Sequence, residues 1–232
     1  MQYEIVNGVL NLSYSNLTEI PDAVWELKGV IELDLTDNPL KKISPKIANF
    51  ADTLTMLDVS ECNLEVLPPE IGKLHNLETL YLVDNQLSDL PDELWQLKKL
   101  ALLDISSNLL RTIPKGIVNL ANSLTELHAW EIKMTNLPPE IGKLVNLQVL
   151  GLVGNKLTEL PDEIGNLSNL RDLDLTINDI VTLPASFINL RNSLEELSLE
   201  DNPIVEDMMA SSDRLSDFFD KLAIYLDTKQ TK

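Results

Sequence analysis

The sequence contains one cysteine, two histidines and no long apolar run, and each shortage excludes a class of protein. Cys62 cannot form an internal disulfide, so the chain is not a disulfide-stabilised secreted domain, and a reducing, cytoplasmic compartment is expected. No apolar run approaches the roughly 20 residues of a membrane-spanning helix. The N-terminal residues also lack the basic and apolar regions of a signal peptide. We therefore expect neither a membrane segment nor export.

Basic residues are scarce as well. The chain has 18 Lys and Arg against 37 Asp and Glu, a formal net charge of -19, so its average field repels nucleic acid and anionic lipid. Basic partners are favoured, although the charge could also serve only to keep an elongated surface soluble. Aromatic residues make up 5% of a chain that is 44% hydrophobic, which indicates a core built mostly from Leu and Ile.

What the sequence does have is an internal repeat of 23 or 24 residues. The frame LxxLxLxxNxL fits residues 77–87, 100–110, 147–157, 170–180 and 194–204. With four looser copies, nine units start at residues 7, 30, 54, 77, 100, 124, 147, 170 and 194. Leucines at frame positions 1, 4, 6 and 11 are expected to point inward, so one face of each LxL strand is buried.

Stacking identical units along the chain predicts an α/β solenoid with the shape of a horseshoe. Its nine parallel strands should line the concave face. The second half of each unit, such as LPPEIGKL, should form a turn and a short 3-10 segment on the convex face. Trp25 and Trp95 fall in this half and are interpreted as convex packing residues.

Frame position 9 is asparagine in six of the nine units, which predicts a ladder of hydrogen bonds between neighbouring turns. The six are Asn38, Asn85, Asn108, Asn155, Asn178 and Asn202. Ser15, Cys62 and Ile132 occupy this position in the other units. We interpret Cys62 as a small buried substitute rather than a reactive thiol.

The repeat stops after Ile204, and an open solenoid end must be sealed. The sequence therefore divides into a solenoid over 1–204 and a C-terminal capping helix with its tail over 205–232. Ser212 is the expected N-cap of this helix. Its apolar face contains Leu215, Phe218, Phe219, Leu222 and Leu226. A membrane or partner helix is the alternative interpretation of the same pattern.

The consensus in residues 67–103 and 137–173, LPPEIGKLxNLxxLxLxxNxL, resembles the Ras-group intracellular leucine-rich-repeat proteins. That set includes the plant intracellular Ras-group-related proteins and the repeat domains of Scribble- and Erbin-like scaffolds, and the same consensus occurs in bacterial cytoplasmic and effector proteins. The resemblance implies a leucine-rich-repeat horseshoe that recruits proteins, sometimes small GTPases or phosphatases. No motif for a particular partner is present, so only the binding role is carried over.

Frame positions 3, 5, 7 and 8 are expected to project from the concave sheet and to form the binding face. The predicted apolar and aromatic patch comprises Tyr81, Val83, Leu102, His128, Trp130, Val149 and Val153. The acidic residues expected to flank it are Asp34, Asp58, Asp104, Glu126, Asp174 and Glu200. Such a centre and rim are typical of protein interfaces.

Glycines in the seventh unit add a further expectation to this face. Gly151 and Gly154 should leave a hollow beside Trp130 for a partner's side chain. The sixth unit breaks the frame at Ala129 and Ile132, which favours a functional site there. The alternative is that residues at these positions vary freely and that Trp130 lies flat against its neighbours.

Enzyme chemistry is not indicated. The two histidines, His75 and His128, fall on opposite faces of the repeat, and no nucleophile, zinc or phosphate-binding motif is present. Concave carboxylates such as Asp34 and Asp58 could pair or bind Ca²⁺, but an open sheet has no water-excluding pocket. We therefore expect no cofactor, no metal and no catalysis.

Two functions are compatible with these features. The first is a monomeric scaffold or adaptor that recruits a signalling protein, whose basic surface and apolar anchor engage the concave face. The alternative is a sequestering inhibitor of a basic enzyme. Neither nucleic acid nor membrane is an expected partner.

Overall fold

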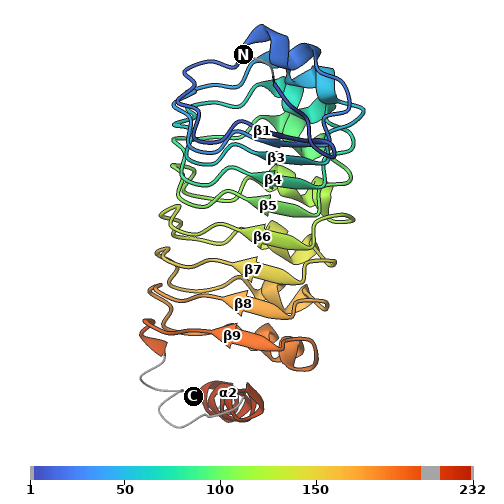
Figure 1. Ribbon diagram of the computed structural model, residues 1–232. Helices are drawn as coiled ribbons and strands as arrows, with labels where there is room; N and C mark the ends of the chain where they lie inside the picture. The colour runs from blue at the N-terminus through green and yellow to red at the C-terminus, as the bar shows by residue number, and fades with distance from the viewer. Residues whose placement is uncertain (1–2, 205–214, 231–232) are drawn as a thin grey trace.

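The computed structural model describes residues 3–204 and 215–230, and the side chains of the last helix as far as Tyr225. Nine strands of three residues form one parallel sheet in sequence order, as predicted. They are β1 (Val9–Asn11), β2 (Glu32–Asp34), β3 (Met56–Asp58), β4 (Thr79–Tyr81), β5 (Leu102–Asp104), β6 (Glu126–His128), β7 (Val149–Gly151), β8 (Asp172–Asp174) and β9 (Glu196–Ser198). Figure 1 shows them stacked along the solenoid.

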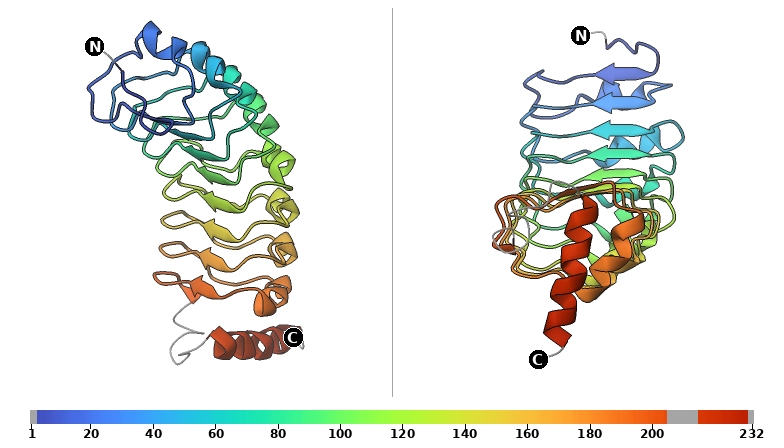
Figure 2. Two further views of the ribbon diagram at one scale, coloured as in Figure 1. Left: turned by 45° about the vertical axis from the view of Figure 1, so that its right-hand side comes forward. Right: turned by 90° about the horizontal axis from the view of Figure 1, so that it is seen from below.

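Short 3-10 helices connect the strands along the opposite side of the solenoid, as expected (Figure 2). They are η1 (Asp22–Glu26), η2 (Pro45–Phe50), η3 (Pro69–Lys73), η4 (Asp92–Gln96), η5 (Lys115–Leu120), η6 (Pro139–Lys143), η7 (Asp162–Asn166) and η8 (Ala185–Asn192). A proline in extended conformation precedes all of them except η2, which follows Ser44. The fixed φ of proline starts the tight turn, and its missing N–H removes a donor that the first turn cannot satisfy.

The core is a continuous column of aliphatic side chains between the sheet and the 3-10 helices. The central leucine of each strand from β1 to β8 is at most 1% exposed. Trp25 and Trp95 are 1% and 3% exposed, which confirms them as packing residues of the convex side. Each unit buries its leucines against the units on either side, and this contact holds a strand of only three residues in place.

The predicted asparagine ladder is present, and Asn155 shows its geometry. Its Nδ2 donates to the carbonyl oxygens of Ala129 at 2.8 Å and Leu152 at 2.9 Å. Its Oδ1 accepts from the backbone N–H of Met134 at 3.0 Å. All six asparagines of the ladder are buried, so each satisfies backbone groups of two units that water cannot reach.

Units without this asparagine use another solution. The buried Cys62 donates through Sγ to the carbonyl oxygen of Leu35 at 3.1 Å, and burial raises the pKa of its thiol to about 11. A protonated, buried thiol is the small substitute that the sequence predicted. Backbone carbonyls also link these units to the preceding ones. The carbonyl oxygens of Cys62 and Ile132 accept from the backbone N–H groups of Lys41 and Arg111, at 3.2 Å each.

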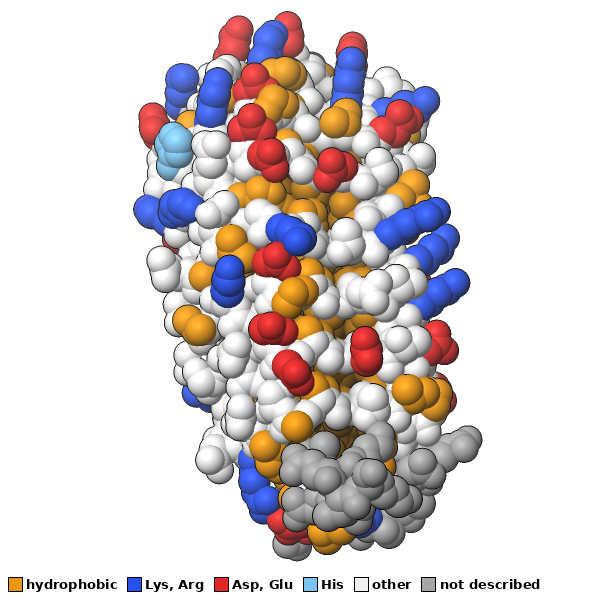
Figure 3. Space-filling model, turned by 180° about the vertical axis from the view of Figure 1, so that it is seen from behind, with side chains coloured by type: hydrophobic (Ala, Val, Ile, Leu, Met, Phe, Trp, Pro, Cys, Tyr) orange, Lys and Arg blue, Asp and Glu red, His pale blue; other side chains and the backbone are white. Residues whose placement is uncertain are grey.

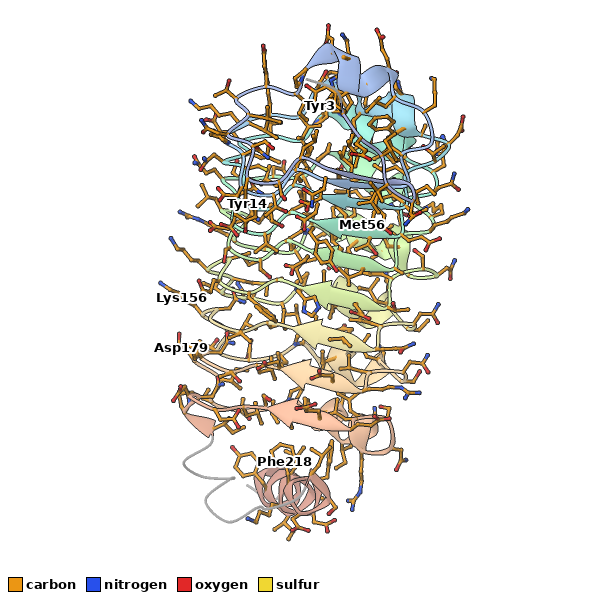
Figure 4. All side chains as sticks on the ribbon, in the orientation of Figure 1. Tyr3, Tyr14, Met56, Lys156, Asp179 and Phe218 are labelled. Carbon is orange, nitrogen blue, oxygen red and sulfur yellow. The ribbon has the colours of Figure 1, made fainter. Side chains whose placement is uncertain are left out.

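Helix α2 (Leu215–Gln230) lies across the open end of the last unit (Figures 2 and 4). Phe218 and Phe219 are buried, and Phe219 stacks on Phe187 of η8 with ring centroids 6.0 Å apart. Arg191 of η8 pairs with Asp220 at 2.8 Å. The predicted N-cap Ser212 and the side chain of Leu226 lie outside the described residues. Among the helices that the structure describes, none is both long and apolar enough to cross a bilayer.

Candidate functional site

The exposed face of the sheet is organised in rows that run across the strands. One row contains Tyr81, Asp104, His128, Gly151 and Asp174, and a second contains Leu102, Glu126, Val149 and Asp172. Asp104 therefore separates Tyr81 from His128, and Glu126 separates Leu102 from Val149. Carboxylates lie close enough to Tyr81 to act on it, because burial and the charges of Asp58, Glu126 and Asp104 raise its pKa.

This register corrects one expectation from the sequence. The residues predicted to form a single apolar patch with an acidic rim fall into two clusters, with carboxylates between them. Tyr81, Val83 and Leu102 form the first cluster, and His128, Trp130, Val149 and Val153 form the second. The physical reason is that the fifth unit contributes Asp104 to the first row and the sixth unit contributes Glu126 to the second.

Trp130 is the most exposed residue of the second cluster, at 41%. Its ring meets that of His128 edge to face, with centroids 5.4 Å apart and planes at 77°. The indole Nε1 lies directly over Gly151, where a side-chain Cβ would collide with it. At Gly154 a Cβ would lie 2.8 Å from Cγ of Glu131. The expected hollow beside Trp130 is therefore filled by the chain's own side chains, and the glycines make room for Trp130 and Glu131.

His128 stands where other units have an aspartate, and the hydrogen bond that this aspartate makes is replaced. In the fifth and eighth units the aspartates at this position, Asp104 and Asp174, accept from the backbone N–H two residues later, at 2.9 and 3.0 Å. His128 does not cap its turn in this way. The N–H of Trp130 donates to Oγ of Ser106 in the neighbouring unit instead, at 3.0 Å.

Ser106 therefore holds the backbone N–H of Trp130, a role that the sequence did not predict for it. The serine is 2% exposed although its frame position was expected to project from the face, and Ser60 at the same position of the third unit is buried too. The sequence carried one signal, which is that a serine stands beside the unit whose capping aspartate is replaced.

Charge is distributed very unevenly over the molecule. Frame positions 3, 5, 7 and 8 of the nine units hold 14 of the 37 acidic residues and none of the 18 Lys and Arg residues. The acidic residues are Glu32, Asp34, Asp37, Asp58, Glu61, Asp84, Asp104, Glu126, Glu131, Asp172, Asp174, Glu196, Glu200 and Asp201. On the side turned away in Figure 1, Lys and Arg side chains are visible at both margins and near the middle, together with acidic side chains (Figure 3). These frame positions of the sheet side therefore carry negative charge with no Lys or Arg among them.

The carboxylates crowd most at Asp172 of β8, a residue that the sequence-based site did not include. Burial raises the pKa of Asp172, and the charges of Glu196 and Asp174 raise it further, while His128 acts in the opposite direction. No Lys or Arg pairs with these three carboxylates in the part of the chain that the structure describes. The cluster therefore retains its mutual repulsion in the free protein.

This repulsion predicts the effect of a conservative substitution. An aspartate whose pKa is raised in the folded state destabilises the folded protein at neutral pH, because folding favours its protonated form. We expect Asp172→Asn to raise the melting temperature at pH 7. The gain should shrink as the pH falls through the raised folded pKa toward the unfolded value. Thermal melts from pH 3 to pH 7 test this, and a lower melting temperature for the variant at pH 7 would contradict it.

Small grooves occur on the molecule, but they lie away from the concave rows. One of about 320 Å³ lies between the first two units and contacts Ile20, Leu40, Lys42, Ile43 and Pro45. Another, of about 360 Å³, lies between the seventh and eighth units beside Leu160, Pro161 and Pro184. Both are furrows between neighbouring units. Within the described residues, no group of three or more His, Cys, Asp or Glu side chains is arranged to hold a metal ion.

Comparison with protein families supports the repeat directly. The family model described as a leucine-rich repeat region matches residues 52–152 and 135–218. Among curated proteins, the rice (Oryza sativa subsp. japonica) plant intracellular Ras-group-related LRR protein 8 is 32% identical over 142 residues. That match covers 60% of this chain and 36% of the rice protein.

Solved structures show the same architecture. A leucine-rich-repeat protein of Leptospira interrogans is similar with a TM-score of 0.79 at 39% identity, over 83% of this chain and 48% of that one. The repeat ectodomain of the receptor kinase GASSHO1/SCHENGEN3 from Arabidopsis thaliana, in complex with CASPARIAN STRIP INTEGRITY FACTOR 2, has a TM-score of 0.61 at 32% identity, over 79% of this chain and 23% of that one. The chain thus spans less than half the length of these relatives.

Proposed function

The chain belongs to the leucine-rich-repeat family, and we propose that it is a non-enzymatic scaffold whose concave face binds a basic protein and recruits it for signalling. Proteins of this family generally act in protein–protein interaction, and their fold is typically a binding scaffold rather than an enzyme. One observation carries the proposal. The exposed Trp130 lies on a face whose outward frame positions hold 14 carboxylates and no Lys or Arg.

The chemistry of this face defines the partner. A basic surface complements the acidic rows, and an apolar or aromatic anchor complements the second cluster around Trp130. Tryptophan is enriched among the few interface residues that contribute most of the binding energy. A monomer in a cytoplasmic, reducing compartment is the setting that we propose, since the lone Cys62 is buried and in thiol form.

The proposal is tested by photocrosslinking from two matched positions in the source cell. A photoreactive amino acid replaces Val153 on the concave face or, as the control, Val145 in the exposed segment after η6. We expect a specific protein to crosslink from position 153 and not from position 145. Equal crosslinking from both positions, or from position 145 alone, would place the interface elsewhere.

The alternative function, inhibition of a basic enzyme, rests on the same acidic face. The purified partner separates the two functions in a titration. An inhibitor abolishes the partner's activity at stoichiometric ratio, whereas an adaptor leaves it intact. The titration is run at concentrations well above the Kd of the complex, so that the partner is bound and its catalysis reports inhibition directly.

Association with the purified partner is expected to slow as salt rises. The Debye length falls from about 10 Å at 0.1 M to about 3 Å at 1 M salt, so the acidic rows lose their long-range attraction. Stopped-flow association rates across this range measure the effect, with sucrose at matched viscosity as the control. A rate that does not change with salt would rule out electrostatic steering.

A further inference from the structure

The indole of Trp130 is a fixed platform rather than a freely rotating side chain. Gly151 lies directly beneath its Nε1, the His128 ring supports its side, and Ser106 holds its backbone N–H. The remaining 41% of the residue is open to solvent. An aromatic face that is held in one orientation loses little conformational entropy when a ligand stacks on it.

Unneutralised carboxylates lie next to this platform. Asp174 is the neighbour of Gly151 in the adjacent strand, at the strand spacing of about 4.8 Å. Asp172 lies on the same face of β8 two residues earlier, and Glu196 is its neighbour in β9. Asp174 uses Oδ1 for the N–H of Thr176, which leaves its Oδ2 free.

A buried nitrogen at the same place also lacks a partner. The Nδ1 atom of His128 is shielded from solvent, has no hydrogen-bond partner, and lies 2.8 Å from where a Cβ of Gly151 would be. A buried polar atom without a hydrogen bond is costly and calls for an explanation. The atom lies where Trp130 covers Gly151, so it marks a polar spot beneath the platform that a ligand does not reach while the indole stays in place.

We infer that this region is a guanidinium subsite, in which an arginine of the partner stacks on Trp130 and binds Asp172 and Asp174. The inference rests on the proposed function and names the anchor of the same partner. Arginine suits both the platform and the carboxylates, because its planar cation stacks on indole and its N–H donors pair with carboxylates in a fork. Lysine has a compact, strongly hydrated ammonium that fits the carboxylates but does not stack in the same way.

Two labelled peptides test the subsite without knowledge of the partner. Fluorescein-labelled nona-arginine and nona-lysine carry equal charge, so a face that only attracts cations binds both alike. We expect the full chain to bind nona-arginine at least about fivefold more tightly than nona-lysine by anisotropy at 0.15 M salt, pH 7. In Trp130→Ala, this preference should fall to near one.

A matched pair of double variants separates local pairing from general charge. Asp172→Asn with Asp174→Asn removes two charges at the subsite, and Asp34→Asn with Asp58→Asn removes two at the other end of the face. Asparagine retains the Oδ1 acceptor that caps the turns at positions 34, 58 and 174. We expect at least a tenfold loss of nona-arginine binding for the first variant and about two- to threefold for the second. Circular dichroism melts verify that all variants are folded.

Three outcomes would overturn the subsite. These are equal affinity for the two peptides in the unaltered chain, a preference that survives Trp130→Ala, and equal losses from the two double variants. None of them affects the proposed function, because crosslinking from position 153 reports a partner of any sequence. Conversely, a clear arginine preference without a crosslinked protein would leave the subsite standing and remove the scaffold role.

Discussion

Trp130→Ala is expected to weaken partner binding by at least about 2 kcal/mol, or roughly 30-fold in Kd, without unfolding the chain. The indole is a solvent-exposed platform, so its removal takes contact area from the interface and opens no cavity in the core. Gly151, which the indole covers, and the His128 ring are unchanged by the substitution. Titration calorimetry with the partner that crosslinks from position 153 measures the loss.

Leu127→Ala is the matched control, because Leu127 lies in β6, three residues before Trp130, and its side chain is buried in the core. Leu127 is fully buried, and truncating a buried leucine costs about 2 to 5 kcal/mol of unfolding free energy. Denaturant unfolding should therefore separate the two variants clearly. If Trp130→Ala unfolds as readily as Leu127→Ala, the tryptophan is structural and the interface loses its anchor. If Trp130→Ala changes neither stability nor binding, the interface lies elsewhere.

Weakening the contact between the C-terminal helix and the last repeat is expected to destabilise the fold. Phe219 of α2 is fully buried and stacks on Phe187, and Phe218 packs edge to face on the same ring. We expect Phe219→Ala to cost about 3 to 5 kcal/mol of unfolding free energy. Ile224→Ala on the same helix is the control, because Ile224 is 66% exposed and should change stability by less than about 0.5 kcal/mol.

Deletion of residues 205–232 extends this test to the whole segment. The eighth 3-10 helix would then expose Phe187 and the last leucines to water, and an open repeat end with bare apolar side chains aggregates. Light scattering and melting temperature measure the outcome. A truncated chain that stays monomeric and melts at the original temperature would mean that α2 is a free partner helix rather than a cap.

The repeat could be predicted almost completely from the sequence, because its signals are local and recur nine times. Leucines at fixed frame positions, a proline before seven of the eight 3-10 helices and asparagine at position 9 of six units favour the same backbone along the chain. Parallel stacking then follows, since a unit that buries one face can do so only against an identical neighbour. The same periodicity predicted the inward leucines, whereas Ser60 and Ser106 at the outward position 7 are buried.

The concave site depended on features that no single unit contains. Gly151 in the next unit leaves the space that the Trp130 ring occupies. Ser106 in the previous unit accepts a hydrogen bond from the Trp130 backbone N–H. The alternation of carboxylates with apolar residues arose from the register of neighbouring strands. The sequence alone therefore determined the solenoid and its acidic concave side. Only the tertiary structure decided where the long side chains lie, because their contacts reach across units and do not follow the repeat.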